Sequence, residues 1–169
     1  MKNLAAAGRT ATLHAAWSGG GDPLYDLWRE DSYDSTDDYD DWDDDQAAIA
    51  FSAAGDVPWS DTAFAGEACF ESGAAGDGET STLLASVEGS GTLAFRWRTS
   101  SEAGRDIVFF SVDGADAASR SGLDDDWTSV SLRIEGDGPH ELSWTYAKDA
   151  SGSAGDDRAR LADVVWLAD

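Results

Sequence analysis

The sequence predicts an all-β protein: an antiparallel jelly-roll β-sandwich preceded by an acidic, largely irregular N-terminal segment. Two observations carry this prediction. From about residue 57 to the C-terminus, short segments alternate apolar with polar residues, and glycine-rich turns separate them. The chain of 169 residues also holds 8 Trp, 6 Phe and 4 Tyr, which is enough aromatic bulk for the core of one domain.

The N-terminal third of the chain carries a dense run of acidic residues. Residues 26–45 contain eleven Asp and Glu and one arginine, within a chain whose formal net charge is -23. Like charges at this density repel one another, and aspartate forms both helices and strands poorly. A glycine-rich stretch opens the region at residues 18–23. We therefore expect residues 18–56 to form an acidic linker.

The clearest strand pattern lies around residue 95. Leu93, Phe95 and Trp97 alternate with polar or small residues that include Arg96 and Arg98. This period of two predicts a strand with one buried face, and it places Trp97 in the core. Similar runs, most of them followed by turn residues, predict further strands over residues 107–112, 130–134, 142–146 and 161–167.

Charge and composition exclude several classes of function. Binding to nucleic acid requires clustered Lys and Arg, and this chain has only 11 of them against 34 Asp and Glu. The same charge argues against an anionic membrane surface, and no run of 18 apolar residues predicts insertion into a membrane. The single cysteine, Cys69, excludes an intramolecular disulfide and a multi-cysteine metal site, and we expect it to be a small core residue.

No catalytic constellation is recognisable, so we expect the protein not to be an enzyme. His14 and His140 lie in different segments, and neither belongs to a Ser/His/Asp or Cys/His pattern. The Gly-x-Ser-x-Gly elbow is absent from the sequence. Carboxylates are so numerous that no particular pair indicates glycoside hydrolysis.

Four aspartates form the candidate metal site. Asp149, Asp156 and Asp157 lie in a Gly/Ser-rich loop that a sandwich would return close to Asp163. Carboxylate oxygens are the ligands that Ca²⁺ prefers, so calcium is the one cofactor that the sequence suggests. The alternative is that these are ordinary turn aspartates, which are favoured because their side chains bond to their own backbone.

Two tryptophans are candidates for ligand binding. Trp59 and Trp127 lie at the expected starts of strands or at loop edges, where an aromatic platform for stacking on sugar rings can form. The alternative is that both side chains cover the end of the core. Trp97, Trp144 and Trp166 fall on the inward phase of the strands, so we expect them in the core.

Several segments resemble known modules of bacterial surface proteins. Gly89–Trp97, Asp106–Gly114, His140–Asp149 and Leu161–Trp166 resemble, in this order, a β-sandwich module related to MAM and concanavalin-like jelly rolls. Residues 3–17, with Leu13, Ala15 and Trp17, resemble the last strand of the listerial–Bacteroides type surface repeat, a small β-grasp-like unit. This resemblance also implies a calcium site, because jelly-roll modules often hold one structural calcium near loops like the one that carries Asp149, Asp156 and Asp157.

The resemblance implies an organisation and a function. Residues 1–17 would be the terminal strand of a β-grasp-like repeat, 18–56 the linker and 57–169 the sandwich. The chain would be an extracellular or cell-surface piece of a longer exported protein, serving as a non-catalytic stalk or binding domain of an adhesin-like protein. Its partner would be an extracellular glycan or protein. The alternative function is a carbohydrate-binding module that targets polysaccharide.

Overall fold

The computed structural model describes residues 10–12 and 49–169 of the chain. The acidic run at residues 26–45, and with it the expectations for residues 1–9 and 13–48, lies outside the described residues. In the part that the structure describes, no helix has the length and apolarity needed to cross a bilayer.

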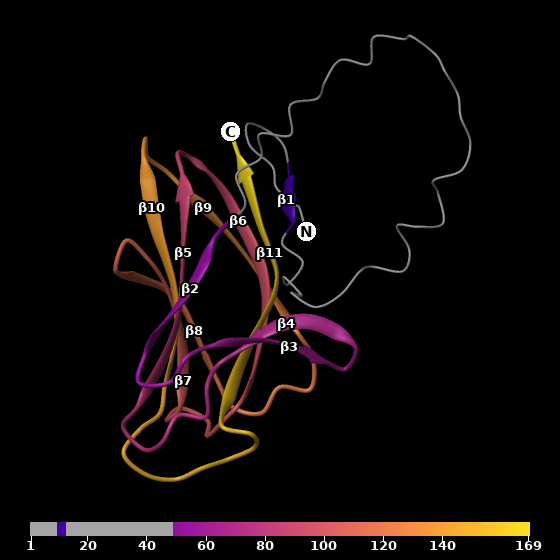
Figure 1. Cartoon of the computed structure of the whole chain (residues 1–169), viewed down its shortest axis with the longest axis vertical. Coiled ribbons are helices and arrows are strands. Elements are labelled where there is room, and N and C mark those ends of the chain that lie inside the picture. Colours follow the sequence, from indigo (N-terminus) through magenta and orange to yellow (C-terminus); the bar gives the residue numbers. More distant parts are fainter. Residues whose placement is uncertain (1–9, 13–48) are drawn as a thin grey trace, which may run out of the picture.

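Two antiparallel sheets pack face to face, which confirms the prediction of an all-β sandwich (Figure 1). Sheet A has the order β3 (Ser60–Phe64), β4 (Glu67–Glu71), β11 (Arg158–Ala168), β6 (Gly91–Ser100) and β9 (Thr128–Ile134). A short strand, β1 (Thr10–Thr12), also pairs with β11. Sheet B has the order β2 (Phe51–Gly55), β5 (Thr80–Glu88), β10 (Pro139–Ala147), β7 (Ile107–Val112) and β8 (Ala115–Ser121).

The core lies between the sheets and is rich in aromatic rings. Phe95 of β6 is 5.0 Å from Phe110 of β7 and 5.5 Å from Trp144 of β10, measured between ring centroids. Trp97 makes an edge-on contact with Phe95 and is 4% exposed. The inward phase predicted for β6 is therefore confirmed, because its Leu, Phe and Trp positions are all buried.

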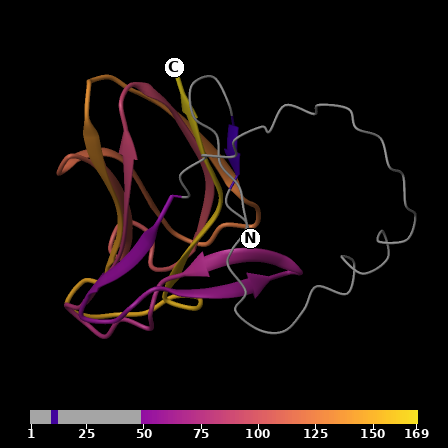
Figure 2. The ribbon, with the colours of Figure 1, turned by 45° about the horizontal axis from the view of Figure 1, so that its top comes forward.

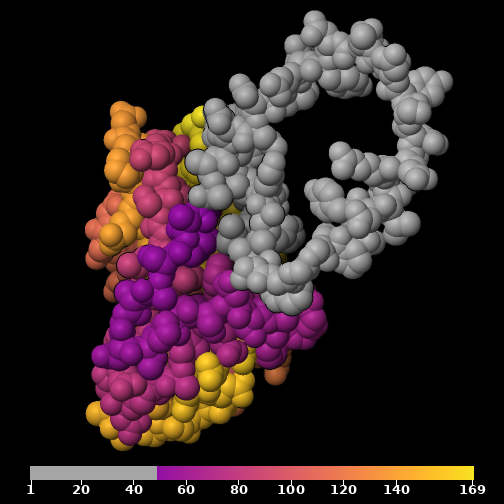
Figure 3. All heavy atoms as spheres, viewed as in Figure 1, coloured from indigo at the N-terminus to yellow at the C-terminus, as the bar shows by residue number. Residues whose placement is uncertain are grey.

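The sandwich begins earlier than residue 57, which corrects the expected end of the linker at residue 56. Residues 51–55 form β2 and pair with β5 at the edge of sheet B. Ile49 belongs to the core, and Phe51 packs its ring 4.8 Å from that of Phe70. In the space-filling view, the purple residues of β2 lie on the surface of the sandwich in contact with their neighbours (Figure 3). Small apolar residues within an acidic region hid this strand from the sequence pattern.

The pairing of β1 also differs from expectation. Residues 10–12, expected to belong to a separate β-grasp-like unit, pair with Val165–Leu167 of β11 in sheet A. β1 and β4 therefore occupy the same edge of β11 at different heights, since β4 pairs with Arg160 and Leu161. Figure 2 shows the β3–β4 hairpin leaving the sheet at this point and extending sideways.

Candidate functional site

On the outer face of sheet A, aromatic rings and charged side chains form one cluster. We call it the arginine–aromatic face and define it by Phe64, Arg96, Arg98, Trp127 and Arg160. Arg96 and Arg98 are adjacent outward positions of β6, and Arg160 lies opposite Arg98 on β11. Phe64 ends β3, and Trp127 precedes β9. Strand pairing thus brings together residues that lie far apart in the sequence.

Trp127, like Phe64, is half-buried on this face. The guanidinium carbon of Arg96 lies 5.4 Å from the centroid of its ring, within the range of a cation–π contact. The ring of Phe64 meets it edge-on, with centroids 6.4 Å apart and planes at 82°. These contacts fix the orientation of the indole while leaving part of it accessible to solvent.

Phe64 contacts two arginines. The guanidinium carbons of Arg98 and Arg160 each lie 4.3 Å from its ring centroid. Arg98 donates through Nη2 to the carbonyl oxygen of Asp124 at 2.6 Å, and Arg160 donates through Nε to Glu71 at 2.6 Å. Because Phe64 is at the tip of the β3–β4 hairpin, this stack pins the hairpin over the sheet.

Carboxylates neutralise most of the arginines on this face. Arg96 is bound on one side by Glu67, at 3.2 Å, and on the other by Asp163. Glu71 binds both Arg160 and its neighbour Arg158. The face therefore presents fixed hydrogen-bonding groups with little net positive charge.

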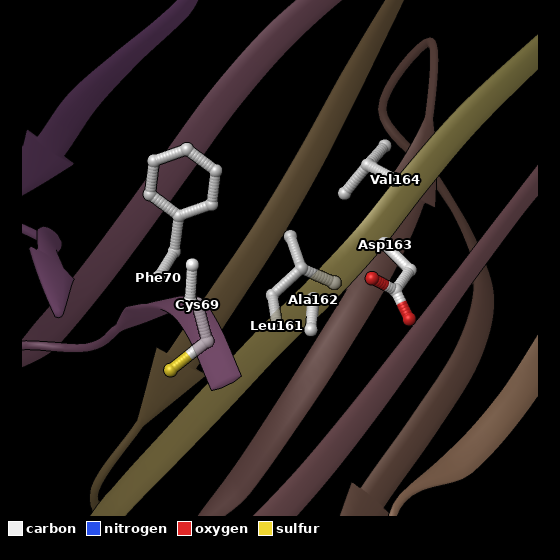
Figure 4. Close-up of a pocket in the computed structure, with 7 residues that line it drawn as sticks. Cys69, Phe70, Leu161, Ala162, Asp163 and Val164 are labelled. Carbon is white, nitrogen blue, oxygen red and sulfur yellow. The ribbon is translucent and has the colours of Figure 1, made fainter. Parts of the chain in front are cut away.

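A β-bulge places Asp163 beside Arg96. The pairing of β11 with β6 shifts register between Ala162 and Val165, so that two residues of β11 stand opposite one of β6. Asp163 takes a φ of 50°, a left-handed conformation that aspartate tolerates better than most residues. Figure 4 shows Asp163 and Val164 extending to opposite sides of β11. The bulge thus turns a carboxylate outward while Val164 stays in the core.

The crevice between β4 and β11 is too small for an organic ligand. Its volume is about 10 Å³, roughly that of one water site, and Cys69 and Asp163 lie on its wall (Figure 4). Burial raises the pKa of the Cys69 thiol, whose residue is 1% exposed. Cys69 is thus buried, as expected.

The two tryptophans proposed for ligand binding have different surroundings. Trp59 is 6% exposed and belongs to the core cluster, so the expectation of a solvent-facing platform there is wrong. Trp127 lies on the arginine–aromatic face, although half-buried.

The four aspartates proposed for calcium are engaged separately. Asp163 binds Arg96, Asp156 binds Arg160, and Asp149 lies 3.7 Å from Arg105. Asp157 binds Lys148 at 3.1 Å. Among the described residues, no three Asp, Glu, His or Cys side chains are grouped so as to hold a metal ion.

Sheet B offers an open groove as the other candidate surface. The groove has a volume of about 490 Å³, and Ser52, Leu84, Ser86 and Glu141 are among its lining residues. Among the residues that the structure describes, no aromatic side chain lines this groove. Phe109 of β7 projects from the outer face of sheet B, since its neighbours Val108 and Phe110 are buried.

The sequence analysis missed Phe64, Glu67 and the grouping of the arginines. Alternation placed Arg96 and Arg98 on an outward face, but not beside Arg160. One signal was available: two Arg-x-Arg pairs, at 96–98 and 158–160, in a chain with a net charge of -23. In so acidic a chain, closely spaced arginines are expected to form ion pairs with particular carboxylates of the same chain.

The loop that leads to Trp127 is anchored by Asp124, and this anchor predicts acid sensitivity. Burial acts to raise the pKa of Asp124, but bonds from Arg120 and from the backbone and hydroxyl of Thr99 outweigh it and lower the pKa. A carboxylate whose pKa is lowered in the folded state stabilises the fold at pH values above its unfolded pKa of about 3.9. This stabilisation is lost as the pH falls through the lower pKa of the folded state. We expect the melting temperature to fall below about pH 5, and more steeply in the wild type than in Asp124→Asn. Thermal melts between pH 3 and 7 measure this; equal slopes would contradict it.

No known protein-family profile matches the chain, and no curated protein matches it. Among solved structures, it is similar to the secreted serine protease VesC from Vibrio cholerae, with a TM-score of 0.56 and 22% identity. That match covers 68% of this chain and 24% of the protease. The chain thus spans about a quarter of the length of that protein.

Two further solved structures match the chain in part. The K3 cleaved adhesin domain of Lys-gingipain from Porphyromonas gingivalis W83 matches with a TM-score of 0.52 and 10% identity, over 70% of this chain and 91% of that domain. A mutant of a family 29 carbohydrate-binding module matches with a TM-score of 0.44 and 12% identity, over 70% of this chain and 82% of the module. The first two matches show that the chain is a β-sandwich similar in fold to part of a secreted protease and to an adhesin domain, both from bacteria.

Proposed function

We propose that this chain is a non-catalytic module of a secreted or surface-exposed bacterial protein, and that it binds a neutral polysaccharide on the arginine–aromatic face. The observation that carries the proposal is Trp127, which is accessible in part and is flanked by Arg96 with its two carboxylates, Glu67 and Asp163. The similarity to an adhesin domain supports the fold of such a module, and the site supports its function.

The chemistry of a sugar matches this arrangement. One face of a pyranose ring presents C–H groups, which pack on an aromatic ring, while the hydroxyls around its rim both donate and accept hydrogen bonds. Trp127 supplies the ring, Arg96 supplies N–H donors, and Glu67 and Asp163 supply acceptors. A few fixed polar groups beside an apolar surface are typical of ligand sites.

The charge balance favours a neutral ligand over an acidic one. The carboxylates on this face already neutralise Arg96, Arg158 and Arg160. The rest of the chain is acidic, at a net charge of -23, and repels polyanions at low ionic strength. We therefore expect glucans, galactans or xylans to bind, and alginate or polygalacturonate not to bind.

Affinity electrophoresis of the full chain in gels containing each polysaccharide tests the proposal. We expect retardation by at least one neutral polysaccharide, weakened about tenfold or more in Trp127→Ala, because truncating an aromatic anchor removes a large share of binding energy. The matched control is Phe109→Ala, which removes an aromatic ring from the outer face of the other sheet and should bind as the wild type does.

Each other outcome has a definite meaning. Binding lost in Phe109→Ala and kept in Trp127→Ala would place the site on sheet B. Retardation only by acidic polysaccharides would contradict the charge argument. If no polysaccharide retards the chain, the module serves as a stalk or as a domain that binds a protein.

A further inference from the structure

The loop 148–157 joins β10 to β11 at one end of the sandwich (Figure 1). A buried cation, Lys148, lies at the start of this loop. The side chain of Lys148 is 3% exposed, and its Nζ is surrounded by oxygen atoms. The neighbours are Asp157 Oδ2 at 3.1 Å, Asp106 Oδ2 at 3.3 Å, the carbonyl of Gly152 at 2.7 Å and Ser153 Oγ at 3.2 Å. Two carboxylates, a carbonyl and a hydroxyl therefore enclose one ammonium group.

The loop is folded around this ammonium. The second oxygen of Asp106 accepts a hydrogen bond from the backbone N–H of Asp149 at 3.0 Å, and that of Asp157 accepts one from Ala154 at 3.2 Å. Each carboxylate thus joins the lysine to the loop backbone. The hydroxyl of Tyr146 is buried without a hydrogen-bond partner, and burial together with the charges of Asp106 and Asp157 raises its pKa.

The donor set is of the kind that holds a calcium ion, but its centre is filled. Carboxylate, carbonyl and hydroxyl oxygens are the ligands of Ca²⁺, which needs six to eight of them. Here Lys148 already bonds to four oxygens of the loop region. A divalent cation would have to displace a buried ammonium or lie next to it, and both are costly.

The other aspartates of the expected calcium site are committed elsewhere. Asp149 and Asp156 pair with Arg105 and Arg160, and Asp163 lies at the bulge beside Arg96. The residues present therefore do not fit the structural calcium that the jelly-roll resemblance implies.

We infer that Lys148 is the internal cation of this loop, taking the place of a metal ion, and that calcium does not bind there. The hydrogen bonds to Asp157 and Asp106 outweigh the effect of burial and raise the pKa of Lys148, so the ammonium stays charged. Burial acts to raise the pKa of Asp157, but its bonds from Ser153, Lys148 and Ala154 lower it. The loop thus carries its own counterion, independent of the calcium concentration outside.

The first test removes the ammonium. In Lys148→Met of the full chain, the buried carboxylate of Asp106 and the half-buried one of Asp157 lose their counterion, and we expect the melting temperature to fall by about 6–20 °C. The matched control is Arg105→Met, which removes an exposed cation that faces the same loop, and it should melt within about 2 °C of the wild type. A melting temperature of Lys148→Met equal to that of the control would overturn the inference.

The second test compares the response to calcium in two chains, so it does not depend on their absolute stabilities. Melting temperatures of the wild type and Asp157→Asn are measured in 5 mM CaCl₂, 5 mM MgCl₂ and EDTA, all at 0.15 M NaCl. Because calcium does not use this loop, the shift between EDTA and CaCl₂ should be the same in both chains. A calcium-selective, saturable shift that Asp157→Asn abolishes would show a metal in the loop and would overturn the inference.

Discussion

Replacing Trp144 with alanine is expected to destabilise the sandwich by about 3–5 kcal/mol, because a large aromatic side chain at the centre of a core leaves a cavity that its neighbours fill only in part. Trp144 is fully buried, and its ring lies 5.0 Å from Phe110 and 5.5 Å from Phe95. The contact with Phe95 of β6 links sheet B to sheet A, and Trp144 also lies 6.2 Å from Phe51 of β2 within sheet B. The loss would be a large share of the roughly 5–15 kcal/mol that stabilises a typical domain.

Chemical denaturation followed by tryptophan fluorescence measures the change in the free energy of unfolding. In a separate thermal melt, a loss of that size should lower the melting temperature by about 6–20 °C in a domain of this length. The matched control is Ser143→Ala, the preceding residue of β10, which faces outward and should change stability by less than about 0.5 kcal/mol. Equal denaturation midpoints for the two variants would show that the packing around Trp144 is not what holds the sheets together.

The double variant Ile49→Ala and Phe51→Ala is expected to cost about 3–6 kcal/mol, because both side chains pack on the core from residues that precede the predicted sandwich. Ile49 is 6% exposed, and Phe51 packs on Phe70 as well as Trp144. Each truncation also weakens the attachment of β2, the edge strand of sheet B that pairs with β5.

Thermal melts of the full chain decide this prediction. The control is Ala54→Ser, a conservative change at an exposed position of the same strand, which should melt within about 2 °C of the wild type. If the double variant melts as the control does, β2 contributes little, and the sandwich is stable from residue 57 onward. The measurement therefore decides where this domain begins.

Arg96 illustrates how far the sequence leads towards the site. Alternation with Leu93, Phe95 and Trp97 placed it on an outward face, and the structure confirms that face. The sequence did not show that Asp163 would meet it, because a β-bulge in β11 was needed to turn that carboxylate outward. Phe64 and Glu67 reached the same face through a hairpin whose path depends on contacts with Arg98 and Arg160.

Trp59 and Lys148 show the opposite case, in which local reasoning was misleading or silent. Trp59 stands just before a strand, where a side chain can face solvent or cover the core. In the folded chain its side chain packs in the core. Lys148 carries no sequence signal, since a single lysine after a strand is ordinarily solvated. Its burial follows from Asp106, 42 residues earlier, which the pairing of β7 with β10 brings beside it.

The sequence alone therefore determined strands β6, β7, β9, β10 and β11, the inward phase of their aromatic residues and the class of fold, because a period of two is a local property that each strand carries within itself. The tertiary structure decided where the sandwich begins, which tryptophan remains accessible and what neutralises the aspartates of the last loop. These depend on the partner that each residue meets across a sheet or between strands. Packing, and the cost of leaving a charge buried and unpaired, decide which partner each residue meets. Neither can be deduced from the sequence of a single segment.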